Sequence, residues 1–208
     1  MTSLGTIAVD AVDRPVMVGV TGTHSTGKST FLARLAHELR LQHIEVSTVA
    51  DLGEKAKTMG IPILFNHTWA STLWIITRGI SNELEAWLHA DVVLVDRPVP
   101  DALGYYRAAL DYRSHEPQPD ELAQLTALVR DHSQRYDLIL RTTLDPEIPL
   151  GSNKARDNNA VFRNLADRHI GHVLAELNLD HEQLPADGHD RVLDHAIKVV
   201  MGKLEDAA

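Results

Sequence analysis

Residues 22–30 read GTHSTGKST, and they join a short apolar segment, VMVGV at 16–20, to a segment at 28–41 whose apolar residues have helical spacing. The stretch contains the pattern Gly-x4-Gly-Lys-Ser, which is typical of loops that bind phosphate groups. Such a loop lies between a strand and a helix, because the helix N-terminus presents free N–H groups to an anion. The sequence therefore predicts a strand, a phosphate-binding loop and a helix, in that order.

The glycines and the polar residues of this loop have separate roles. Gly22 and Gly27 allow positive φ angles and a close approach of the backbone, so that successive N–H groups converge on phosphate oxygens. Lys28 would reach the β- and γ-phosphates, and the Ser29 hydroxyl would coordinate Mg²⁺. A chance match in a chain of this length is expected in about one sequence in a hundred. We predict a triphosphate site formed by Gly22, Thr23, His24, Ser25, Thr26, Gly27, Lys28, Ser29 and Thr30.

The composition favours one domain with a local anion site. The chain has 208 residues, of which 44% are hydrophobic, and this is enough for a full core in a single domain over residues 1–208. The formal net charge of −9 argues against a surface that coats nucleic acid, because backbone phosphates are bound by clustered Lys and Arg. The absence of cysteine excludes disulfides, thiolate metal sites and a Cys nucleophile.

The sequence also predicts neither a signal peptide nor a membrane helix. The N-terminal residues lack the basic region of a signal peptide, and no apolar run approaches the roughly 20 residues that a membrane helix needs. We expect a cytoplasmic protein without a nucleic-acid or membrane partner. The sequence leaves a homo-oligomer open.

Short β-branched segments alternate with longer amphipathic segments along the chain. This alternation is typical of a parallel sheet covered by helices on both faces. We expect strands at 16–20, 44–49, 92–95, 138–140 and 182–184. We expect helices at 28–41, 52–59, 68–89, 119–136, 158–177 and 189–204. The order βαβααβαβαβα predicts a three-layer α/β fold with a five-stranded parallel sheet.

The third expected strand ends in Asp96, and Arg97 follows it. In a protein with a phosphate loop, a carboxylate at this place holds Mg²⁺ directly or through water, although a structural turn is the alternative. A Glu after the Asp would polarise a water for hydrolysis, whereas Arg97 cannot act as a base. Its guanidinium would instead neutralise charge that develops on a transferred phosphoryl group. The pair therefore favours phosphoryl transfer over hydrolysis.

The segment DRP at 96–98, with Asp101, Ala102 and Tyr105 after it, resembles the strand-end segment of the P-loop nucleoside and nucleotide kinases. It is most similar to the AAA-type group that includes the ribosylnicotinamide kinase domain of bacterial NAD regulators. The resemblance implies the P-loop NTPase fold, ATP and Mg²⁺ as cofactors, and a small-molecule acceptor such as a nucleoside or a ribosylated pyridine.

A cationic segment follows the fourth expected strand. Kinases of this fold close an arginine-bearing lid over the phosphates and so exclude water. The resemblance implies a lid at about 150–163, with Arg156 as the lid arginine and Arg163 as a second one. The alternative is a solvated helix face on which these arginines form ordinary surface ion pairs.

Two features point to the acceptor side of the site. Asp51 follows the second expected strand and could accept the proton of the attacking hydroxyl, while the N-cap of the next helix is an equally good interpretation. Trp74, Arg78 and Asn82 share one face of the long helix, as an acceptor platform or as part of the core.

Three functions remain open at this point. The leading hypothesis is an ATP- and Mg²⁺-dependent kinase in which Lys28, Asp96, Arg97, Arg156 and Asp51 act on the phosphoryl group and its acceptor. The second is a P-loop ATPase that hydrolyses ATP to switch a partner protein. The third is an ATP-binding module without turnover.

Overall fold

The computed structural model describes residues 14–24, 26–142, 144 and 159–207. At its centre is a five-stranded sheet in the order β2-β3-β1-β4-β5, in which every neighbouring pair is parallel. The strands are β1 (Val16–Thr21), β2 (Val46–Val49), β3 (Val92–Asp96), β4 (Leu138–Thr142) and β5 (Glu182–Leu184). The predicted α/β class and the five parallel strands are therefore confirmed.

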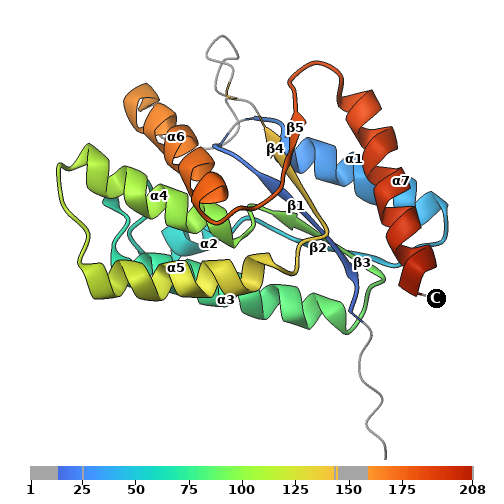
Figure 1. Cartoon of the computed structure of the whole chain (residues 1–208), viewed down its shortest axis with the longest axis horizontal. Helices are drawn as coiled ribbons and strands as arrows, with labels where there is room; N and C mark the ends of the chain where they lie inside the picture. The colour runs from blue at the N-terminus through green and yellow to red at the C-terminus, as the bar shows by residue number, and fades with distance from the viewer. Residues whose placement is uncertain (1–13, 25, 143, 145–158, 208) are drawn as a thin grey trace, which may run out of the picture.

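Helices cover both faces of this sheet. Figure 1 shows α1 and α7 on one face, and α3, α4, α5 and α6 on the other. Their bounds are α1 (Lys28–Leu41), α2 (Gly53–Thr58), α3 (Trp69–Trp87), α4 (Val99–Tyr112), α5 (Pro119–Ser133), α6 (Ala160–Glu176) and α7 (His189–Ala207). A 3-10 turn, η1 (Leu64–Asn66), precedes α3.

Helix α4 was not predicted from the sequence. Its first turn contains Pro100 and its middle contains Gly104, and both residue types argue against a helix. Proline is tolerated in a first turn, because the N–H that it lacks has no partner within the helix. Tertiary packing then stabilises the rest of α4, which buries ten of its residues, from Val99 to Ala109.

The central strand β1 is buried along its whole length. Val16, Val18 and Val20 face the layer formed by α1 and α7, and Met17 faces the opposite side. A strand that is covered on both faces needs apolar residues at every position, which explains the continuous apolar segment that precedes the phosphate loop. The loop therefore follows directly from a fully buried strand at the centre of the sheet.

Gly104 lets α4 and α6 pack closely, and this contact gives a stability prediction. A Cβ at Gly104 would lie 2.6 Å from Ile170 Cγ1 and 2.9 Å from the Ile170 backbone N and Cα. We expect Gly104→Ala to lower the free energy of unfolding by about 1–3 kcal/mol, measured by urea denaturation. In α7, a Cβ at Gly202 would meet nothing within 4 Å. Gly202→Ala, the control, should stabilise the protein by about 0.5–1 kcal/mol, and equal effects of the two changes would contradict the prediction.

The expectations about membrane helices and about a single domain concern the whole chain. Among the helices in the described ranges, none is long and apolar enough to cross a membrane. The single domain over residues 1–208 remains a prediction, and most of the expected lid segment lies outside the described residues.

Candidate functional site

The loop after β1 has the backbone conformation that a phosphate site needs. Gly22 and Gly27 have φ angles of 132° and 83°, which residues other than glycine rarely adopt. A Cβ at Gly22 would collide with the Thr142 hydroxyl of β4. Gly27 is the N-cap residue of α1 and brings no capping side chain, so the first N–H groups of α1 face the loop. Ser25, which was predicted to belong to this site, lies outside the described residues.

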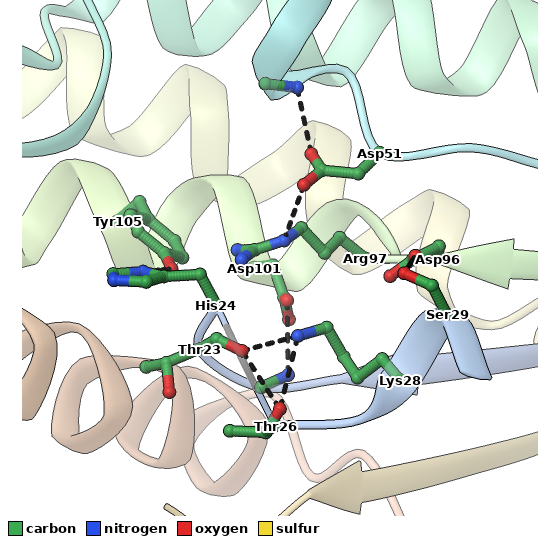
Figure 2. A network of polar contacts seen from close by, with 12 residues as sticks. Thr23, His24, Thr26, Lys28, Ser29, Asp51, Asp96, Arg97, Asp101 and Tyr105 are labelled. Atoms are coloured by element: carbon green, nitrogen blue, oxygen red, sulfur yellow. Dashed lines mark hydrogen bonds and ion pairs between the residues drawn. The ribbon is translucent and has the colours of Figure 1, made fainter. Parts of the chain in front are cut away.

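Lys28 folds back over the loop instead of extending into solvent. Its Nζ donates hydrogen bonds to the Thr23 carbonyl and, at 3.4 Å, to Thr26 Oγ1 (Figure 2). The side chain is buried. Burial, followed by the nearby charge of Arg97, lowers the pKa of Lys28 to about 7. A bound phosphate beside the ammonium would raise this pKa again, because an opposite charge favours the protonated form.

The two predicted metal ligands lie together. Ser29 is the second residue of α1 and Asp96 ends β3, and the parallel pairing of β1 with β3 places Val20 opposite Asp96. The Ser29 hydroxyl donates to Asp96 Oδ2 at 2.5 Å. A hydroxyl and a carboxylate are oxygen donors of the kind that Mg²⁺ uses when substrate phosphates and water complete its octahedron. The described residues hold no cluster of three His, Cys, Asp or Glu side chains that could bind a metal without phosphate.

Arg97 and Asp51 form an ion pair above the loop. Arg97 Nε lies 2.9 Å from Asp51 Oδ2, and the guanidinium carbon lies 5.0 Å from the centre of the Tyr105 ring. The other Asp51 oxygen accepts the Gly53 N–H at 2.9 Å, at the start of α2. One carboxylate thus makes a helix-end hydrogen bond and also faces Arg97. The N-cap residue of α2 is Leu52, so the interpretation of Asp51 as the N-cap is wrong by one residue, whereas its role as a proton acceptor stays a prediction.

The predicted lid is described only in part. Arg156 lies outside the described residues. Arg163 is buried on α6, so a solvated helix face does not account for it. Asp167 lies one turn further along α6 and is partly buried. Burial raises the pKa of this carboxyl, against the opposing charges of Arg141, Arg163 and Lys28.

Asp101 is a site residue to which sequence reasoning gave no role. It lies in the first turn of α4, where it accepts hydrogen bonds from the Thr21 hydroxyl and, at 3.2 Å, from the Gly22 N–H. Burial raises the pKa of Asp101 to about 6, although Arg97 and Lys28 oppose the shift. This carboxylate ties the start of the phosphate loop to α4. An acid shortly after the segment DRP was the available signal, but α4 was not predicted.

A cavity of about 1360 Å³ continues from the phosphate loop past Asp96 and Arg97. Its far part is lined by residues 60–67 and by α3. There, Nδ1 of the buried His67 is hydrogen-bonded to Thr72 Oγ1 at 3.3 Å. Burial, together with the positive charges of Arg97 and Arg113, lowers the pKa of this histidine to about 3. The imidazole is therefore neutral near pH 7, and the far wall is mostly apolar.

The predicted acceptor platform on α3 is wrong. The helix residues that line the cavity are Ile75, Gly79 and Glu83, whereas Trp74 and Arg78 do not line it. Asn82 lines a separate hollow of about 510 Å³ beside β2. The residues that line the cavity also recur at four-residue spacing. Each of them follows a residue of the predicted face by one position, so the cavity-lining face is rotated by about 100° around the helix axis from the predicted face.

Comparisons with known proteins agree with this fold. A family model described as an AAA domain matches residues 17–191. A structure of a NadR protein in complex with NR has a TM-score of 0.60 and 21% identity, and the match covers 90% of this chain and 50% of that chain. A structure of a NadR protein with NAD and AMP-PNP has a TM-score of 0.62 and 18% identity, with the same coverage. The chain thus spans about half the length of these two proteins. No curated protein matches by sequence.

Proposed function

The chain belongs to the AAA domain family, and we propose that it is an ATP- and Mg²⁺-dependent kinase that phosphorylates a small-molecule acceptor. The observation that carries this proposal is the cavity, which runs from the phosphate loop past Asp96 and Arg97 into an apolar chamber. Hydrolysis needs room for one water beyond the γ-phosphate, whereas transfer needs a chamber for an acceptor. Arg97 after Asp96, where a hydrolase would benefit from an acid, also favours transfer.

The described residues divide the reaction between them. The loop N–H groups and Lys28 hold the phosphates of ATP. Ser29 and Asp96 would hold Mg²⁺, which would neutralise charge on the phosphates. Arg97 stabilises the charge that develops on the γ-phosphoryl group. Arg163, which is buried on α6, would add a further positive charge, and the lid role of Arg156, outside the described residues, stays a prediction from the sequence.

The transfer step forms one bond and breaks one. The acceptor hydroxyl oxygen attacks the γ-phosphorus, and the bond from this phosphorus to the β–γ bridging oxygen breaks, so that ADP leaves. Asp51 accepts the proton of the hydroxyl as the new bond forms. Its position beside Arg97, on the cavity wall between the loop and the chamber, supports this role.

The acceptor that we propose is a nucleoside or a nucleotide-like compound. The solved NadR structure that binds NR matches 90% of this chain in fold, and its ligand gives the class to test first. An apolar chamber with a few polar groups such as Asn66 and neutral His67 would suit a ring with hydroxyl substituents.

An acceptor panel tests the proposal. ADP formation from Mg-ATP is measured with nucleosides, nucleotides and ribosylnicotinamide, each compared with the acceptor-free rate. We expect at least one acceptor to raise ADP formation about tenfold or more and to gain the mass of one phosphoryl group. ADP formation that no acceptor changes would favour the ATPase, and tight ATP binding without ADP would favour the module without turnover.

A further inference from the structure

A series of buried hydrogen bonds, which we call the polar chain, connects the wall of the apolar chamber to the turn that contains Arg97. Glu83 of α3 lines the cavity and is 1% exposed. The Tyr136 hydroxyl donates to the Glu83 carboxylate, at 3.0 Å and 3.1 Å from its two oxygens. The same hydroxyl oxygen accepts the Val99 N–H at 3.3 Å. His132 Nε2 lies 2.6 Å from Glu83 Oε2 and fixes the carboxylate from the other side.

The turn at the end of this chain needs support. Arg97 has a φ angle of 67°, a left-handed conformation that is unfavourable for a residue other than glycine. Its N–H donates to the Val20 carbonyl at 3.2 Å. Pro98 packs on β1 so tightly that a Cβ at Gly19 would lie 3.1 Å from Pro98 Cγ. These contacts hold the turn from the side of the sheet.

The helix side of the turn depends on Tyr136. The N-cap residue of α4 is Pro98, which has no side-chain acceptor for the first N–H groups of the helix. The Tyr136 hydroxyl fills this place at Val99. Tyr136 is itself fixed, because the adjacent Asp137 donates its N–H to the Met17 carbonyl at 2.8 Å and accepts the Met17 N–H at 2.9 Å.

We propose that Glu83 and Tyr136 are positioning residues that hold the Arg97 turn in the conformation used for phosphoryl transfer. This inference rests on the proposed kinase function. Neither side chain needs to touch the transferred group. Glu83 orients the Tyr136 hydroxyl, and the hydroxyl holds Val99, two residues after Arg97. A buried acid in a mostly apolar wall is costly unless it is hydrogen-bonded, and the contacts with Tyr136 and His132 supply these hydrogen bonds.

Amide hydrogen exchange tests the polar chain without any need for activity. In the wild-type protein, we expect the Val99 amide to be at least about tenfold better protected than the Asp120 and Glu121 amides in the first turn of α5, which has no side-chain cap. Tyr136→Phe should remove this protection at Val99 and lower it at Arg97, while the Val18 amide in β1 changes little. Unchanged protection, or a Val99 amide as exposed as those of α5 in the wild type, would overturn the inference.

Tyr112→Phe is the matched control. Tyr112 lies at the other end of α4, is 40% exposed and also uses its hydroxyl in a hydrogen bond, with Asn159 Nδ2 at 2.8 Å. This change should leave the Arg97 and Val99 amides as they are. Glu83→Gln keeps an oxygen that can accept the Tyr136 hydroxyl proton, so it should retain most of the protection.

A double-mutant cycle links the chain to catalysis. With the best acceptor, Tyr136→Phe should lower kcat about tenfold and leave the KM for ATP unchanged, because the phosphate loop is not altered. In an Arg97→Ala background the same change should cost nothing further. Additive losses would show that Tyr136 acts independently of Arg97 and would overturn the inference. A wild type that phosphorylates no acceptor would refute the kinase, while the exchange experiment would still decide whether Tyr136 holds the turn.

Discussion

Lys28→Ala should lower the rate of Mg-ATP turnover about 10²–10³-fold. The Lys28 ammonium is buried over the loop and makes its hydrogen bonds to loop atoms of Thr23 and Thr26. In a site with little water, a fixed positive charge stabilises phosphate charge far more than it would in solution. The loss is measured as the initial rate of ADP formation with the best acceptor, after thermal unfolding has shown that the variant is folded.

A control and a pH series complete this prediction. Lys203→Ala removes an exposed lysine of α7 and should leave turnover unchanged. The pKa of Lys28 is lowered to about 7, and a bound phosphate raises it, so wild-type affinity for ATP should be highest below pH 7 and fall as the pH rises above it. Lys28→Ala should lose this dependence. A variant within twofold of the wild-type rate would remove Lys28 from the mechanism.

The parts of the fold that the sequence predicted correctly are those that local patterns determine. The inner strands β3, β1 and β4 are short, mostly apolar segments, because a parallel strand with helices on both faces is buried on both sides, whereas the edge strands β2 and β5 include exposed polar residues. Helix α1 begins at Lys28 and ends at Leu41, as its apolar spacing predicted. The family match over residues 17–191 confirms the resemblance that the segment at 96–98 indicated.

Tertiary contacts decided what the sequence did not predict. Helix α4 contains Pro100 and Gly104, and its stability comes from packing against α6 at Ile170, which no local pattern shows. The face of α3 that lines the cavity could not be identified, because apolar residues on this helix pack in several directions, against α4, α5 and the sheet. Asp101 had no assigned role for the same reason, since its importance depends on where α4 begins.

The site shows the same division between local and distant information. Gly22, Gly27 and Lys28 lie in one continuous motif, so their arrangement could be predicted from spacing alone. The contact between Ser29 and Asp96 joins residues far apart in the sequence, and it requires β3 to lie next to β1. The ion pair of Arg97 with Asp51 likewise depends on β2 lying next to β3.

Substitution of Asp96 is expected to have the second large effect on turnover. It is the carboxylate that the fold places against Ser29, at the end of a buried strand, and its side chain is 8% exposed. Asparagine has the same shape and can still accept the Ser29 hydroxyl proton, so the fold should tolerate the change. It lacks the negative charge that attracts Mg²⁺, directly or through water.

We therefore expect Asp96→Asn to lower Mg²⁺-dependent turnover at least about 100-fold. The variant should also need more Mg²⁺ to reach its half-maximal rate. Its unfolding midpoint should stay close to that of the wild type. Asp91→Asn is the matched control, because Asp91 directly precedes the same strand at its far end, is exposed and accepts the Glu45 N–H at 3.0 Å. The rates of both variants are measured across a Mg²⁺ titration. If Asp96→Asn kept the wild-type response to Mg²⁺, the metal would have to be held elsewhere, and the contact with Ser29 would be only a structural link between α1 and β3.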